Sequence, residues 1–149
     1  MAKYLICKVG SEYYGVPLLK VSEITGVMPL SPVPATPAYM RGVMSLRGKP
    51  VPVVDLGRKR GYPEDTPFTR FACILIMGVE VGKQRRLVGW IVDGVTEYAE
   101  IWPDDIKETR KPAPVVGLAT VKGKTVVLLD LDEALSNEDA AVLRRIFNG

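Results

Sequence analysis

The chain has 149 residues, of which 47% are hydrophobic and 25% charged, and its formal net charge at pH 7 is +3. This composition is typical of a soluble globular protein, and the mild positive excess is unlike the dense positive field of a dedicated nucleic-acid binder. The sequence contains no histidine, which excludes histidine triads, histidine metal ligands and phosphohistidine transfer.

Short apolar runs dominate the chain. They are rich in valine, isoleucine and leucine and are separated by glycine, proline or charged clusters, a pattern that predicts strands rather than helices. We expect ten strands and therefore a mostly β protein. The predicted strands are 4–9, 12–16, 21–28, 42–47, 50–55, 70–78, 85–93, 95–101, 116–122 and 124–130.

Helical signals are few, and the strongest is at the C-terminus. Ser136 followed by Asp139 resembles a capping box at a helix start. The apolar residues after it then fall on one face of a helix, which predicts that the helix packs this side on a barrel. Those residues are Val142, Leu143, Ile146 and Phe147, and short helical turns are also expected at 17–20, 37–41 and 132–135.

Two irregular segments interrupt the strand pattern. Residues 29–39 carry four prolines in eleven positions, which predicts an extended connector. Residues 57–69 combine glycine, charge and proline, the composition of an exposed linker. The second segment is the natural boundary between two halves of the chain.

The two halves contain similar sequences. GVMSLRGKPVPVVDL at 42–56 and GLATVKGKTVVLLDL at 117–131 are identical at six of fifteen positions. GVPLLKVSEI at 15–24 aligns with GWIVDGVTEY at 89–98, in the same order and at nearly the same spacing. Two such matches predict an internal duplication that forms two similar small barrels.

The longer repeat contains a hairpin turn in each copy. Gly48 and Gly123, each between two cations, are expected to adopt a positive φ. Pro50 and Pro52 place two missing N–H groups on one side, so this strand should lie at an edge or at the end of a sheet on that side. The 124–130 copy is free to pair on both sides. Arg47 at the turn is either an interface anchor or an ordinary exposed arginine.

Signals for catalysis or nucleotide binding are weak. Neither GxxxxGK[ST] nor GxGxxG occurs. Asp130 and Asp132 could hold a divalent cation in a small hydrolase, although a strand end followed by helix-capping acids explains them better. Basic clusters at 58–60 and 83–86 suggest a single-strand nucleic-acid-binding barrel, but aromatic residues do not alternate with them, which favours solvated loops.

The two cysteines lie in strand-like runs and are expected to be buried free thiols.

Four segments in succession resemble the signatures of the CheW family of chemotaxis coupling proteins. They are EYYGVPLLKVSEI, PVPATPAYMRGVMSLRGKPVPVVDL, LVGWIVDGVTEYAEI and GKTVVLLDLDEAL. The resemblance implies one CheW-like domain of two SH3-like five-stranded β-barrels packed together, with short helices and a C-terminal helix. Its barrels would be 1–66 and 67–149, an approximate division because the chain can cross between them.

The resemblance also implies a function. CheW proteins are not enzymes and need no cofactor; they are cytoplasmic adaptors that are recruited to membrane receptor arrays. They join the histidine kinase CheA, through its CheW-like regulatory domain, to the cytoplasmic tips of methyl-accepting chemotaxis receptors. We therefore expect no nucleic-acid partner and no direct insertion into a membrane, which agrees with the absence of any apolar run of about 18 residues and of a signal peptide.

The family motifs map onto particular residues of this sequence. By motif position, Arg47 matches an arginine associated with receptor coupling, and Glu23 matches another partner-contact position. The aliphatic floor of a receptor groove between the barrels would consist of Leu18, Val21, Ile24 and Val95. Kinase contacts are expected on the barrel ends, without assigned residues.

Three departures from the family pattern concern the partner rather than the fold. Ser45 replaces a usual asparagine, Gly57 replaces a common arginine, and the proline-rich connector lacks a basic residue often present before Val33. A coupling protein of another chemosensory system, for example one that serves pilus-based motility, therefore stays an alternative.

Overall fold

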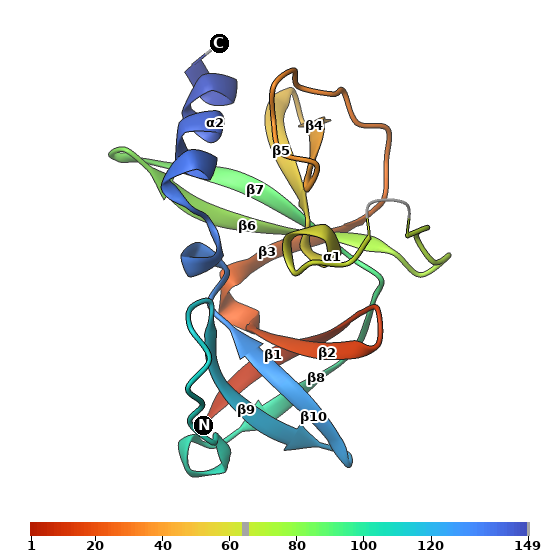
Figure 1. Cartoon of the computed structure of the whole chain (residues 1–149), viewed down its shortest axis with the longest axis vertical. Helices are drawn as coiled ribbons and strands as arrows, with labels where there is room; N and C mark the ends of the chain where they lie inside the picture. Colours follow the sequence, from red (N-terminus) through yellow and green to blue (C-terminus); the bar gives the residue numbers. More distant parts are fainter. Residues whose placement is uncertain (64–65, 149) are drawn as a thin grey trace.

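The computed structural model describes residues 1–63 and 66–148. It confirms the mostly β class, with ten strands in two five-stranded sheets and a C-terminal helix (Figure 1). The strands are β1 (Ala2–Val9), β2 (Glu12–Pro17), β3 (Val21–Gly26), β4 (Met40–Leu46), β5 (Lys49–Asp55), β6 (Cys73–Val81), β7 (Gln84–Val92), β8 (Gly94–Ile101), β9 (Val115–Val121) and β10 (Lys124–Leu129). The helices are α1 (Leu56–Lys59) and α2 (Asn137–Asn148), with single 3₁₀ turns at Leu18–Lys20, Pro103–Asp105 and Leu131–Ala134.

The two sheets have the same topology. One has the strand order β8-β1-β2-β10-β9 and the other β3-β6-β7-β5-β4. In each sheet only one neighbouring pair is parallel, β2 with β10 and β7 with β5, and the other pairs are antiparallel. The sheets lie one above the other along the long axis of the molecule (Figure 1).

Each sheet contains strands from both halves of the chain. β1 and β2 pair with β8 and β10, whereas β3 and β5 pair with β6 and β7. The chain crosses between sheets at the 3₁₀ turn Leu18–Lys20 and again at Asp93. The expected boundary near residue 66 therefore does not separate the two sheets. It falls between two successive units, β1–β5 and β6–β10, that exchange strands to complete both sheets.

Equivalent positions of the repeat occupy equivalent places in the two sheets. Gly15 pairs with Leu128 across β2 and β10, and Gly89 pairs with Val53 across β7 and β5. A Cβ atom at Gly15 would lie 2.8 Å from Leu128 Cδ2, and one at Gly89 would lie 2.7 Å from Ile74 Cγ2. Both positions thus need glycine because a neighbouring side chain occupies the space of a Cβ atom.

Backbone hydrogen bonds repeat in the same way. The N–H of Asp55 donates to Tyr39 O at 2.7 Å, and the N–H of Asp130 donates to Pro114 O at 2.9 Å. Asp55 is the last residue of β5 and Asp130 directly follows β10, and each caps the following turn through its side chain. The duplication that the sequence predicts is therefore visible in the register and in the turns.

One hydrophobic cluster joins the two sheets and α2. It contains Tyr14 and Leu5 from one sheet, Trp90 and Leu75 from the other, and Leu143 from the helix. Each sheet also has a smaller cluster of its own. The sheets therefore share a core, which agrees with the single domain that the family resemblance implies.

The C-terminal helix begins as predicted and is held by a buried ion pair. Asp139 N–H donates to Ser136 Oγ, and Ser136 N–H donates to Asp139 Oδ2, both at 3.0 Å. Asp139 is fully buried and also accepts from Tyr39 Oη and Lys59 Nζ, each at 2.6 Å. We call Asp139, Lys59 and Tyr39 the helix latch, because their contacts hold α2 against α1 and against the segment before β4.

No helix of the described residues is long and apolar enough to cross a membrane.

Hydrogen bonding decides the charge state of the helix latch. Burial alone would raise the pKa of Asp139, but hydrogen bonds from Lys59, Tyr39 and the Ser136 backbone outweigh burial, and the pKa is lowered. For Lys59, burial lowers the pKa while hydrogen bonds to Asp139 and Tyr39 raise it, and the net change is upward. Both groups are therefore charged at neutral pH.

The two irregular segments match their predictions only in part. Residues 37–40 form a single turn, closed by a 2.9 Å hydrogen bond from the Met40 N–H to Pro37 O, and β4 begins at Met40. The segment 57–69, of which residues 64 and 65 lie outside the described residues, is not simply an exposed linker. It starts in α1, Arg60 Nε donates to Tyr14 Oη at 3.3 Å, and Tyr62 Oη donates to Glu12 Oε1 at 3.1 Å. The basic cluster 58–60 therefore binds the fold rather than only solvent.

The proline-containing strand β5 is not an edge strand. It lies between β4 and β7, but its parallel pairing with β7 is confined to Val53–Asp55. The prediction failed because Pro50 and Pro52 affect only the first half of the strand. Strand β10, in contrast, pairs with β2 from Val126 onward, the position that corresponds to Val51. The pairing of β5 with β7 therefore begins two residues later than the pairing of β10 with β2, and β5 is still not an edge strand.

Candidate functional site

The turn between β4 and β5 presents Arg47 at its tip. Arg47 and Gly48 have φ values of 51° and 81°, the two positive values that a type I′ hairpin requires. The Arg47 side chain is 71% exposed and its guanidinium forms an ion pair with Glu23 on β3. Since β3 and β4 are the two edge strands of their sheet, this ion pair joins opposite edges. The hydrogen bond to Glu23 also raises the pKa of Arg47, which keeps the side chain charged.

The other sheet contains an equivalent ion pair. Lys122 and Gly123 have φ values of 49° and 78°, and Lys122 Nζ lies 2.6 Å from Glu97 Oε2. Glu97 is on β8, again the edge opposite the hairpin. We call Arg47–Glu23 and Lys122–Glu97 the two seam pairs. Joining the sheet edges is thus a role that both copies share, and Arg47 is more than an ordinary turn residue.

Two of the predicted groove residues line the same hollow. Ile24 on β3 and Val95 on β8 face a hollow of about 500 Å³ that also touches Phe71 and Cys73. Ile24 is 46% exposed, so it offers apolar surface to a partner. Sequence reasoning missed Phe71, which is 66% exposed, because it stands at the start of an apolar run that was assigned to a strand.

The other two predicted aliphatic residues lie deeper. Leu18 and Val21 are half-buried and pack against the core cluster that joins the two sheets. Val21 pairs with Met77 in the β3–β6 ladder. Leu19, beside them in the 3₁₀ turn, is fully exposed at 100% and was missed. The structure therefore brings Glu23 together with Arg47, and Ile24 with Val95, and places Leu18 and Val21 against the core.

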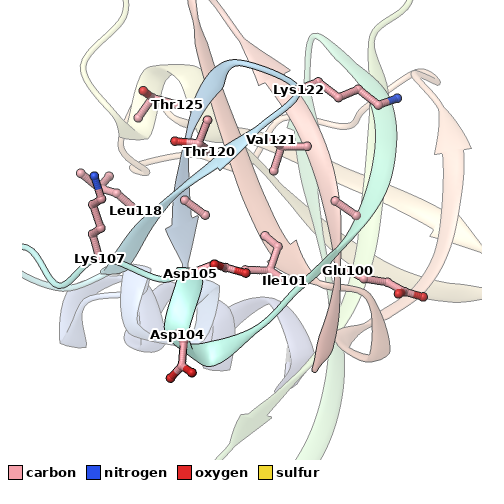
Figure 2. Close-up of a pocket in the computed structure, with 12 residues that line it drawn as sticks. Glu100, Ile101, Asp104, Asp105, Lys107, Leu118, Thr120, Val121, Lys122 and Thr125 are labelled. Carbon is pink, nitrogen blue, oxygen red and sulfur yellow. The ribbon is translucent and has the colours of Figure 1, made fainter.

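A larger hollow lies elsewhere, near the Lys122 seam pair (Figure 2). It has a volume of about 650 Å³, lies beside β8 and the β9–β10 hairpin, and has Glu100, Asp104 and Asp105 along its wall. In Figure 2 the carboxylates of Glu100 and Asp104 point in different directions rather than toward a common centre. This arrangement does not resemble the convergent carboxylates of a hydrolase.

The carboxylates considered for a metal site have other partners. Asp130 Oδ1 accepts a hydrogen bond from the Asp132 N–H at 3.1 Å, which caps the 3₁₀ turn. Asp132 Oδ2 lies 3.5 Å from Lys20 Nζ. Within residues 1–63 and 66–148 no group of three or more histidine, cysteine, aspartate or glutamate side chains is placed to hold a metal ion. The capping interpretation of these acids is the one that the contacts support.

The cysteines have the character of core residues. Both are free, Cys7 is buried, and Cys73 is half-buried. Burial, with smaller contributions from Cys73 and Asp93, raises the pKa of Cys7 to about 12. Its thiol is therefore protonated at neutral pH and is a poor nucleophile.

Comparisons with known proteins agree with this architecture. The family model for the CheW-like domain matches residues 3–139. Chemotaxis protein CheW of Klebsiella aerogenes is 28% identical, covering 97% of this chain and 87% of its own length. Chemotaxis protein CheW of Rhizobium meliloti is 30% identical over 89% of this chain and 86% of its own length. Protein FrzA of Myxococcus xanthus is 31% identical over 93% of this chain and 78% of its own length.

A solved structure has the same fold. The crystal structure of scaffolding protein TtCheW from Thermoanaerobacter tengcongensis matches with a TM-score of 0.81 and 25% identity, covering 93% of this chain and 90% of that one. The match includes both sheets, since it spans nearly the whole chain. Together with the family model over residues 3–139, it shows that this chain belongs to the CheW-like family.

Proposed function

We propose that this protein is a non-catalytic adaptor that couples methyl-accepting chemotaxis receptors to the histidine kinase CheA. The observation that carries this proposal is the CheW-like match over residues 3–139, in a fold whose two sheets both match a CheW scaffolding protein. Relatives at 28% and 30% identity are named chemotaxis protein CheW. The adaptor acts in the cytoplasm, is recruited to receptor arrays, and needs no cofactor.

The receptor would bind at the hollow lined by Ile24 and Val95 and at the seam pair of the proline-containing copy. A receptor tip of helical character would place apolar side chains on Ile24 and Val95, while Arg47 and Glu23 supply charged contacts. Leu18 and Val21 support this surface from the core. Arg47 suits this role because its exposed guanidinium can exchange Glu23 for a carboxylate of the partner.

CheA would bind through a contact between its CheW-like regulatory domain and this CheW-like chain. The regulatory domain of CheA is itself CheW-like, so edge strands and loops at the ends of the two sheets are the surfaces available for it. Simultaneous binding of receptor and kinase holds the kinase at high local concentration near the receptor tips. Small receptor changes can then shift the population of active kinase.

Co-sedimentation tests the proposal directly. Purified protein is mixed with CheA and with membranes that contain a methyl-accepting chemotaxis receptor, and the kinase in the pellet is measured. We expect CheA to sediment only when the adaptor is present, and kinase activity to follow the receptor ligand. Failure of folded adaptor to bring CheA into the pellet would refute the coupling function.

A coupling protein of another chemosensory system is the second candidate. The observation in its favour is the 31% identity to Protein FrzA, which is as high as the identity to the CheW relatives. Co-sedimentation with receptors and kinases from the chromosomal neighbourhood of each chemosensory system in the source organism would separate the two candidates.

A further inference from the structure

A cleft opens where the two prolines prevent β5 from pairing with β7. The ladder between these strands covers only Val53–Asp55, so Lys49–Pro52 diverge from β7. Pro50 and Pro52 have no N–H group to offer across the gap. The equivalent strands of the other sheet are paired from Val126 onward. The unpaired stretch of β5 is therefore two residues longer than that of β10.

The cleft has an apolar floor and a cationic rim. Its volume is about 270 Å³. Val51 is fully buried beneath it, and Leu87 and Phe147 form half-buried walls. We call it the basic cleft, because its remaining lining residues besides Pro50 are Lys49, Arg85 and Arg86.

Within the described residues, the three cations of the rim form no ion pair with a carboxylate. The ion pairs of the structure involve other lysines and arginines. Glu80 is opposite Arg85 in the β6–β7 register, yet the two are not paired. Arg86 instead donates to Gln84 Oε1, and its guanidinium carbon lies 5.7 Å from the centre of the Phe147 ring. Uncompensated cations around a hollow attract a negatively charged partner.

The backbone beside the cleft is also available. From Gln84 to Val88, β7 pairs only with β6 within the described residues, because β5 joins it first at Gly89. Its other side therefore presents N–H and C=O groups that belong to no ladder. Such an edge can hydrogen-bond an extended peptide, and alternate side chains of that peptide would enter the hollow.

We propose that the basic cleft binds an extended acidic segment of a partner protein. One apolar side chain of the segment occupies the space above Val51, Leu87 and Phe147, and flanking carboxylates contact Lys49, Arg85 and Arg86. Negative charge complements the rim, and an extended backbone complements the open side of β7, a feature that a lipid surface would not use. The proposal is independent of the receptor contacts of Arg47.

Peptide binding tests the proposal. The probe is a short fluorescein-labelled peptide in which aspartate and glutamate flank a central leucine, titrated with the full-length protein by fluorescence anisotropy. We expect saturable binding that weakens with added NaCl and that is lost when the acids are replaced by their amides. Arg85→Glu with Arg86→Glu, and separately Lys49→Glu from the other wall, should each weaken binding by at least about tenfold.

A matched double variant controls for net charge. Arg110→Glu with Lys111→Glu makes the same change in charge at exposed residues of the other sheet's connector, and it should bind the acidic peptide like the wild type. Thermal melting of each variant establishes that it is folded. Since Lys49 and Arg85 lie on different strands, a folding defect in one variant leaves the other as a test.

Three results would overturn the proposal. The first is no saturable binding of the acidic peptide by wild-type protein, and the second is an equal loss of binding in the Arg110→Glu, Lys111→Glu control. The third is sedimentation with phosphatidylglycerol vesicles that depends on Arg85 and Arg86 while the peptide fails to bind, which would assign the cleft to a membrane surface.

Discussion

The hairpins β4–β5 and β9–β10 have the same turn and the same kind of seam pair, but they differ on the side that faces the parallel strand. Arg47–Glu23 and Lys122–Glu97 join equivalent sheet edges. On the far side, β10 is paired from Val126, whereas β5 is open up to Pro52. The copy with the prolines thus has unpaired backbone at positions where the other copy is paired.

The presence of equivalent ion pairs in both copies changes the interpretation of Arg47. From its motif position Arg47 is expected to contribute to receptor coupling, whereas the sequence assigns no such role to Lys122. The structure gives both residues a structural contact of the same kind, so exposure and an ion pair do not distinguish them. What can distinguish them is the set of residues around each one.

The helix latch joins α2 to the copy with the prolines, and breaking it should have the largest effect. Lys59→Met leaves the buried Asp139 carboxylate without its cation, and we expect a loss of about 3 kcal/mol in the free energy of unfolding. Urea denaturation monitored by Trp fluorescence measures it. As a control, Lys20→Met removes the exposed ion pair with Asp132 and should cost less than about 1 kcal/mol. Equal effects of the two variants would show that the latch is not a stabilising contact.

Acid should weaken the same latch. The folded pKa of Asp139 is below its ordinary value, so its contribution is present above the unfolded pKa and is lost as the pH falls through the folded pKa. The stability difference between wild type and Lys59→Met should therefore shrink as the pH is lowered below about 4. Denaturation curves of both proteins at several pH values test this, and a difference that grows toward acid pH would contradict it.

The glycines at the parallel pairs should respond alike. Gly15→Ala and Gly89→Ala each place a methyl group against a neighbouring side chain, and each should cost about 1–3 kcal/mol. Gly26→Ala is the control, because no atom lies within 4 Å of a Cβ added there, and it should change stability by no more than about 0.5 kcal/mol. A large effect at only one of the two parallel-pair glycines would argue against equivalent packing in the two copies.

The hollow beside β3 should matter for binding but not for folding. Ile24→Asp is expected to weaken receptor binding by about tenfold while the melting temperature stays close to that of the wild type. Its equivalent in the repeat, Tyr98, is 69% exposed, and Tyr98→Asp should leave receptor binding unchanged. Val21→Asp is a poorer probe, because Val21 packs against the core. Receptor binding that is equally weakened by both exposed variants would remove the distinction between the copies.

Much of the fold could be predicted from local patterns. All ten strands and the capped C-terminal helix follow from short apolar runs, from the glycine, proline and charged clusters between them, and from the spacing of Ser136 and Asp139. The repeat predicted equivalent hairpins, and the register of Gly15 and Gly89 bears this out. Local patterns could not show that the two units exchange strands, because each strand is equally compatible with either sheet until the crossing at Leu18–Lys20 is known.

The candidate site was less predictable for a related reason. The contact of Glu23 with Arg47 joins strands that are distant in the ladder order, and no local rule links the two residues. Lys59 and Asp139 are far apart in sequence, so a composition typical of a linker concealed a buried ion pair. The proline pattern wrongly predicted an edge strand, because only the first half of β5 lacks pairing with β7, and the extent of the cleft depends on the position of β7 and α2.

Receptor binding by variants of the two seam pairs is the decisive measurement for the role of Arg47. Arg47→Ala and Lys122→Ala are compared with wild type by co-sedimentation with receptor-containing membranes, after melting curves have shown that both are folded. We expect Arg47→Ala to bind at least about tenfold more weakly than the wild type and Lys122→Ala to bind like the wild type. Wild-type affinity of a folded Arg47→Ala variant, or an equal loss in both variants, would contradict it.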